Sequence, residues 1–89
     1  MDDERPHRDF PDTYSIKAVG RDRDDFADHA KAVVTSIVAA GDSVTHKTRA
    51  SKNGTYLSVT INFTARDQAE LDRVFTTMNA DDRVVWVLY

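Results

Sequence analysis

The sequence predicts an α+β sandwich in which a four-stranded antiparallel sheet carries two helices on one face. Three observations predict it. Apolar and polar residues alternate in short segments that are typical of strands, and apolar residues recur at helical spacing in two longer segments. These segments follow one another in the order β-α-β-β-α-β. The dipeptide Asn53-Gly54 separates the second and third strand segments, where Asn-Gly favours a tight hairpin.

Residues 1–12 predict a flexible acidic tail that precedes the fold. Five acidic residues outnumber two arginines there, and Phe10 is the one sizeable apolar side chain besides Met1. Such a segment buries too little surface to offset the entropy lost on ordering. We therefore expect one domain, residues 13–89, with one modest core.

The first half of this domain predicts a strand followed by a helix. Residues 13–19 alternate as in a half-buried strand that ends at Gly20. Residues 24–40 place Phe26, Ala30, Val33, Val34, Ile37 and Val38 on one helical stripe. We expect Asp22, Asp24 and Asp25 to cap this helix, although they also suggest a cation site, and Gly41 to take the left-handed position after it.

The second half predicts a hairpin, a helix and a last strand. Residues 43–50 and 55–64 are the hairpin arms, and the second arm alternates so cleanly that one of its faces must be buried. Residues 68–79 carry an apolar stripe, with Thr64 and Asp67 spaced like a capping box. Residues 83–89 form a strand that is apolar on both sides.

Right-handed crossovers arrange these elements as a ferredoxin-like fold, with strands one and three in the centre of the sheet. The expected core comprises Ile16, Leu57, Val59, Ile61, Phe63 and Trp86 under Phe26, Val34, Val38, Leu71 and Phe75. The opposite sheet face is expected to present Lys17, Val19, Tyr56, Ser58, Thr60, Val85 and Val87. That face mixes valines with hydroxyls, so we expect a partner to cover it.

Composition and charge restrict the function. The formal net charge is −3, and the chain has no cysteine, which excludes disulfides and thiolate metal sites. No segment is apolar enough for a membrane span or a secretory leader, so we expect a cytoplasmic protein. Residues 43–66 hold four basic residues and no acid. This basic stretch suits an anionic partner, whereas bulk nucleic-acid binding is not expected of a chain with this overall charge.

Several chemistries of this fold are disfavoured by the residues present. RNA binding needs stacked aromatics on the third strand, where Ser58 and Thr60 follow Tyr56. Paired cysteines for a metal are missing after the first strand, and acidic residues beside Arg21 would repel a phosphate. His7, His29 and His46 show no ligand spacing and are expected to face solvent. We expect no catalytic residue, no metal and no cofactor.

The loop after the first strand is similar to that of the amino-acid-binding regulatory domains of the ACT type. Those domains share this layout, bind a small ligand at this loop and pair their sheets side by side in a dimer. In the present sequence Asp24 and Asp25 stand where that turn usually has Pro and Gly.

Nearly the whole domain resembles the YbeD-like family of small bacterial proteins. The resemblance rests on Phe10-Pro11, Ile16-Lys17-Ala18-Val19-Gly20, the hairpin segment Ser51-Lys52-Asn53-Gly54-Thr55-Tyr56-Leu57-Ser58-Val59 and Arg83-Val84-Val85-Trp86-Val87-Leu88. It implies an ACT-like ferredoxin fold, a regulatory or interaction role and no known activity.

The leading hypothesis is a non-enzymatic regulatory or protein-interaction module, with a homodimer as one possible assembly. The alternative is a sensor for an amino-acid-like or anionic metabolite, and an RNA-binding module is a third interpretation. The candidate ligand or partner residues are Lys17, Gly20, Arg21, Lys47, Arg49, Ser51, Lys52, Tyr56 and Ser58. Ser51 also has a structural interpretation, because its hydroxyl can bond the backbone of the turn.

Overall fold

The computed structural model describes residues 11–21 and 25–88. They form β1 (Asp12–Arg21), α1 (Phe26–Ile37), the 3-10 turn η1 (Gly41–Ser43), β2 (Thr45–Ala50), β3 (Tyr56–Ala65), α2 (Gln68–Asn79) and β4 (Val84–Leu88). The predicted flexible tail spans residues 1–12; residues 1–10 lie outside the described residues, and the predicted end of the tail is wrong because Asp12 already pairs with Ala65 in β1. The predicted element order is confirmed, and the predicted bounds of the second helix agree with those of α2.

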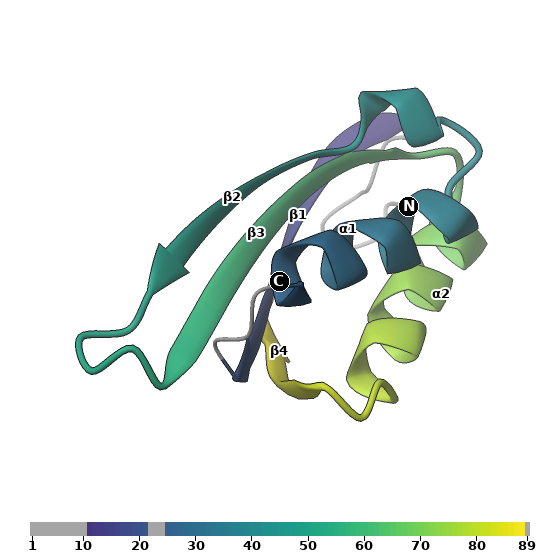
Figure 1. Ribbon diagram of the computed structural model, residues 1–89. Helices are drawn as coiled ribbons and strands as arrows, with labels where there is room; N and C mark the ends of the chain where they lie inside the picture. Colours follow the sequence, from purple (N-terminus) through teal and green to yellow (C-terminus); the bar gives the residue numbers. More distant parts are fainter. Residues whose placement is uncertain (1–10, 22–24, 89) are drawn as a thin grey trace, which may run out of the picture.

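The four strands form one antiparallel sheet in the order β2-β3-β1-β4. β1 and β3 are therefore central, as predicted, and both helices lie on one face of the sheet (Figure 1). This arrangement confirms the ferredoxin-like α+β fold. The other face, which we call the open face, carries no helix among the described elements.

The core lies between the helices and the sheet. Alternate residues of the two central strands point into it, while each helix contributes one apolar stripe, as the periodicity predicts. The fully buried members are Ile16, Ala18, Val59, Ile61, Phe63 and Ala65 from the sheet and Phe26, Ala30, Val34, Leu71, Val74 and Met78 from the helices. Leu57 and Phe75 are partly buried and pack against this cluster.

The prediction of which residues of the last strand face the helices is wrong. Val19 pairs with Trp86 while Gly20 pairs with Val84, so Val85 is an extra residue that makes a bulge in β4. Trp86 and Leu88 consequently belong to the open face, whereas Val84 and Val87 pack against the core. Every residue of β4 is apolar, so alternation could not indicate which side faces the helices.

The ends of α1 also differ from the prediction. Asp25 is the residue before the helix, but its side chain makes no capping hydrogen bond, and Asp22 and Asp24 lie outside the described residues. The helix ends at Ile37, and Val38 is already extended. One cause is that the Ala39 N–H donates to Glu70 Oε2 (3.0 Å) instead of continuing the helix. Gly41 therefore begins η1 and does not take the left-handed position predicted for it.

The cap of α2 is displaced by three residues from the prediction. Asp67, and not Thr64, is the N-cap, because its Oδ1 accepts the N–H of Glu70 (2.9 Å). Glu70 Oε1 in turn accepts the N–H of Arg66 (2.8 Å). This reciprocal arrangement resembles a capping box that is shifted by one backbone group.

The predicted hairpin joins β2 and β3, although its loop is longer than the tight turn that the Asn-Gly pair suggests. Ser51 N–H donates to the Tyr56 carbonyl (2.8 Å), and Gly54 N–H donates to the Ser51 carbonyl (2.9 Å). Gly54 has φ +72°, the one positive φ among the described residues, so Asn53 does not adopt the left-handed geometry that a two-residue turn requires. The four residues between Ser51 and Tyr56 form the loop.

Candidate functional site

The open face is defined by the strand register. Paired residues of antiparallel strands point to the same side of the sheet. Residues that pair with buried core residues therefore point toward the helices, and the remaining pairs form the open face. Its members are Thr13, Ser15, Lys17, Val19 and Arg21 of β1, Thr45, Lys47 and Arg49 of β2, Tyr56, Ser58, Thr60, Asn62 and Thr64 of β3, and Trp86 and Leu88 of β4.

Cross-strand pairing arranges part of this face in two rows. One row is Lys47, Thr60, Lys17 and Leu88, and the next is Arg49, Ser58, Val19 and Trp86. Each row begins with a cation on the outer strand β2 and ends with a large apolar side chain on the outer strand β4. The rows therefore join a basic margin to an apolar margin.

The charge of the open face has one sign. Lys17, Arg21, Lys47 and Arg49 belong to it, and Lys52 lies exposed in the adjoining hairpin loop. Within residues 11–21 and 25–88, none of the members of the open face is acidic. An anionic group approaching this side of the molecule is therefore attracted and meets no local repulsion.

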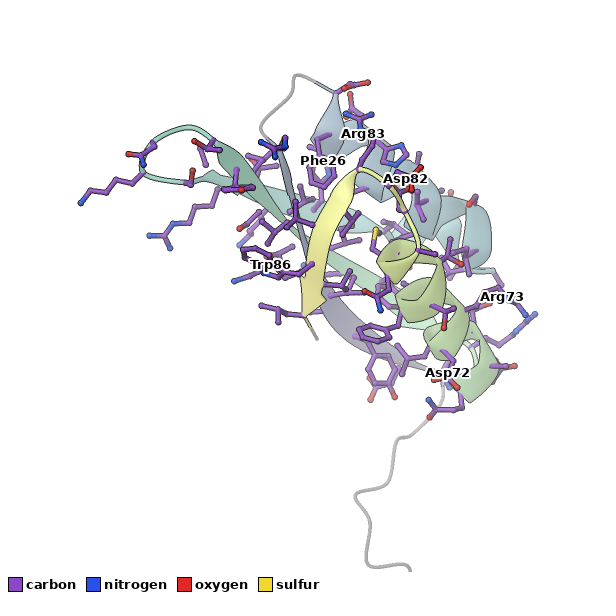
Figure 2. All side chains as sticks on the ribbon, turned by 90° about the horizontal axis from the view of Figure 1, so that it is seen from below. Phe26, Asp72, Arg73, Asp82, Arg83 and Trp86 are labelled. Carbon is purple, nitrogen blue, oxygen red and sulfur yellow. The ribbon has the colours of Figure 1, made fainter. Side chains whose placement is uncertain are left out.

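The apolar margin is exposed. Trp86 is 49% exposed and Leu88 is 50% exposed, and the bulge residue Val85 is 47% exposed. Figure 2 shows Trp86 projecting from β4 away from the two helices. Val19, in the same row as Trp86, is only 5% exposed although it lies outside the main core cluster. The margin is therefore a packed apolar surface and not an isolated side chain.

Two aromatic rings meet on the open face. The ring centroids of Tyr56 and Trp86 lie 6.2 Å apart with the planes tilted by 40°. The guanidinium of Arg21 lies 5.9 Å from the centroid of the Tyr56 ring, in the range of a cation–π contact. The sequence predicts Tyr56 on this face and Trp86 in the core, so the aromatic pair follows from the position of Trp86 that the prediction had wrong.

The structure brings four of the predicted site residues together. Lys17, Lys47, Arg49 and Ser58 line a shallow hollow of about 310 Å³, with Thr48 and Thr60. Arg21 and Tyr56 are paired directly across β1 and β3. Sequence reasoning missed Trp86 and Leu88 as members of this surface, and no signal in the uniformly apolar strand could have assigned them to it.

Three other predicted site residues have different roles or positions. Gly20 is buried, and a Cβ at this position would lie 2.5 Å from Cζ of Phe26 and 2.6 Å from the carbonyl oxygen of Arg83. Gly20 therefore permits close packing and does not face a ligand. Ser51 Oγ accepts the N–H of Tyr56 (3.0 Å), which confirms its structural interpretation. Lys52 is exposed in the loop, apart from the hollow.

A polar cluster on the helix side joins α1 to the start of β4. Arg83 Nη2 contacts Asp25 Oδ1 (2.6 Å), and the Arg83 guanidinium lies 5.8 Å from the centroid of the Phe26 ring (Figure 2). Hydrogen bonding and attraction from Arg83 lower the pKa of Asp25, and Asp25 likewise raises the pKa of Arg83. We assign these contacts to holding the fold together.

The histidine prediction is wrong for His29. Its Nε2 lies 2.6 Å from Asp81 Oδ2, so this side chain bridges α1 to the connection before β4 instead of facing solvent freely. His46 is half-buried, and His7 lies outside the described residues. Across the described part of the chain, no group of three His, Asp or Glu side chains could hold a metal ion. None of the helices described there is long and apolar enough to cross a membrane.

Comparison with known proteins identifies relatives over most of the chain. A family model described as "Protein of unknown function (DUF493)" matches residues 5–88. A UPF0250 protein of Shewanella halifaxensis is 37% identical over 79 residues, which cover 89% of this chain and 88% of that protein. One of Azotobacter vinelandii is 34% identical over 88 residues, covering 98% and 96%. These matches confirm the resemblance to the YbeD-like family.

Two solved structures share the fold at low sequence identity. The solution structure of protein HP0495 from H. pylori matches with a TM-score of 0.77 at 17% identity and covers 98% of this chain and 91% of that one. The C-terminal domain of the MgtC protein from Mycobacterium tuberculosis matches with a TM-score of 0.65 at 14% identity, covering 92% and 89%. At these identities the likeness concerns the fold alone.

Proposed function

This chain belongs to the DUF493 family, whose description assigns no function, and we propose that it is a non-enzymatic regulatory module that binds a protein partner through its open face. The observation that carries this proposal is the pair of cross-strand rows. Both rows run from a cation on β2 to an exposed large apolar residue on β4. Protein interfaces combine such an apolar anchor with polar groups around it.

The chemistry of the open face favours binding over catalysis. Thr60 lies between Lys47 and Lys17 in one row, and Ser58 lies beside Arg49 in the next. In the described chain, no histidine or carboxylate, the side chains that most often serve as general bases, belongs to this face. Its cations and hydroxyls are groups that bind and orient a partner.

Affinity capture with matched variants tests this proposal. The full chain, the double variant Lys47→Ala/Arg49→Ala and the control Lys31→Ala/Arg73→Ala are immobilised and exposed to cell extract. Both variants lose two positive charges, but Lys31 and Arg73 belong to the helices. We expect at least one protein to be captured by the wild type and the control and lost from the Lys47/Arg49 variant. Identical captured sets for both variants would contradict the proposal.

A second candidate function is a sensor of a small anionic metabolite. The observation that favours it is the hollow of about 310 Å³ that Lys17, Lys47 and Arg49 line, near the lower limit of volumes that hold small ligands. Addition of L-aspartate or citrate to the ¹⁵N-labelled chain tests it. Saturable shifts of the amides of Lys17, Lys47 and Ser58 would favour the sensor, and unchanged spectra would reject both compounds as ligands.

A further inference from the structure

We infer that the docking segment of the partner protein is acidic and carries one bulky aliphatic anchor, with the acidic residues on Lys47 and Arg49 and the anchor on Trp86 and Leu88. This inference rests on the proposed function and specifies the chemistry of the partner. It is drawn from the charge, the exposed apolar surface and the strand register of the open face.

The distribution of charge selects an acidic partner. The nine described acidic residues all lie off the open face: Asp12, Asp25, Asp28, Asp42, Asp67, Glu70, Asp72, Asp81 and Asp82. Five of the nine described lysine and arginine residues belong to that face or to the adjoining hairpin loop. The two sides of the molecule therefore carry opposite charge, and an acidic segment is attracted to the open face and repelled from the helices.

The same asymmetry argues against a second copy of this chain docked face to face. Two open faces stacked with β2 over β2 would place Lys47 and Arg49 of one copy against the same cations of the other, and stacked with β2 over β4 they would leave these cations without a carboxylate. Like charges brought together at an interface oppose association. The occupant of this face therefore has a different chemistry from the face itself.

The apolar margin requires an anchor. An exposed tryptophan beside an exposed leucine, with the buried Val19 next to it, matches the aromatic-centred surfaces that supply most of the binding energy at protein interfaces. An aliphatic side chain packed on Trp86 would remove apolar surface from water on both partners. A purely acidic segment would leave this margin uncovered.

The pair of Tyr56 and Trp86 rings is poorly arranged for stacking against nucleic-acid bases. Base stacking needs open ring faces, but the Arg21 guanidinium already lies over the Tyr56 ring, and the Tyr56 and Trp86 planes are tilted by 40°. Leu88 and Val85 have no polar side-chain group that could hydrogen-bond a base edge or a phosphate. A protein segment uses both margins, whereas a single-stranded nucleic acid would use the cations alone.

The register sets the spacing between the acids and the anchor. Arg49 and Trp86 lie in one row on β2 and β4, which are three strand intervals apart in the sheet. Adjacent strands are about 4.8 Å apart, so the two ends of the row are about 14 Å apart. An extended segment that crosses the strands covers this distance in about four residues at about 3.3 Å per residue.

Synthetic peptides test the inference, and Trp86 reports on binding because it is the one tryptophan of the chain. The probe has two glutamates, a Ser-Gly-Ser spacer and a leucine. One comparison peptide replaces leucine with serine, and another replaces both glutamates with glutamine. We expect a saturable change in Trp86 fluorescence with the probe, and dissociation constants about tenfold higher with each comparison peptide, since each lacks one of the two contacts.

Variants of the full chain locate the binding. Lys47→Ala/Arg49→Ala should raise the dissociation constant of the probe about threefold to tenfold, whereas Lys31→Ala/Arg73→Ala should leave it unchanged. The chain's own acids at positions 2, 3, 4 and 9 are removed as competitors by a further variant with Asn or Gln at these positions. A probe that binds neither the wild type nor this variant overturns the inference.

Two further outcomes would overturn it. One is equal binding of the glutamine peptide, which would make the charges irrelevant. The other is tighter binding of a twelve-nucleotide oligothymidine than of the probe, which would assign the face to nucleic acid. If affinity capture still yields a protein that depends on Lys47 and Arg49, the proposed function stands and only this partner chemistry fails. If capture fails as well, the proposed function fails with it.

Discussion

Glu70 is the buried carboxylate whose removal should be most damaging to this fold. Its side chain is 1% exposed and lies at the junction of three segments. Oε1 accepts the Arg66 N–H before α2, and Oε2 accepts the Ala39 N–H after α1. The perturbation is Glu70→Ala, with Glu70→Gln as the variant that preserves size and removes the charge.

The expected loss in the free energy of unfolding follows from these two hydrogen bonds. A hydrogen bond to a charged group contributes about 1.5–3 kcal/mol net, so losing both in Glu70→Ala should cost about 3–6 kcal/mol. A chain of this length is stable by only about 4–13 kcal/mol, so this variant should lose a large part of its free energy of unfolding. In Glu70→Gln the amide oxygen replaces one acceptor while its NH₂ opposes the other N–H, which should cost about 2 kcal/mol.

Urea denaturation followed by far-ultraviolet circular dichroism measures the effect. The midpoint should fall for both variants, with the larger fall for alanine and an unchanged slope. Asp72→Ala is the control, because Asp72 lies on α2 and is exposed, and its carboxylate bonds only the side chain of Gln68 among the described contacts. If Glu70→Ala cost no more than Asp72→Ala, the carboxylate would not hold these segments together.

The remaining predictions concern packing, exposure and pH. Gly20→Ala should cost about 2–3 kcal/mol, because its Cβ would overlap Phe26, and an unchanged melting temperature would show that the backbone relaxes freely there. Trp86→Ala should cost about 1–2 kcal/mol since half of the side chain is exposed, and a loss of about 4 kcal/mol in urea denaturation would place it in the core after all. Because Arg83 lowers the pKa of Asp25, ionised Asp25 stabilises the fold above its ordinary pKa, and this stabilisation is lost as the pH falls through the lowered value. Asp25→Asn should therefore reduce the melting temperature at pH 7 and have no effect well below the pKa, and an equal reduction at both pH values would contradict the pairing.

Several features of the chain were predictable because they depend on local periodicity. The alternation of β3 and the stripes of α1 and α2 reflect how side chains repeat along a strand or a helix, and burial in the structure follows them. The Asn53-Gly54 pair indicated the hairpin, although the loop is longer than a two-residue turn. The acid-free stretch from 43 to 66 indicated the basic margin on β2 in advance.

By itself, then, the sequence determined the order of the elements, the antiparallel sheet, the family and the basic part of the candidate surface. Tertiary structure decided the rest, because it depends on contacts between residues distant in the chain. The bulge at Val85 assigned Trp86 to the open face, since a uniformly apolar strand has no preferred side until it pairs. Arg83 engaged the carboxylate of Asp25 that was expected to cap α1, and Glu70 ended that helix from another element. Long-range partners thus compete with local signals for the same polar groups, and here they prevailed.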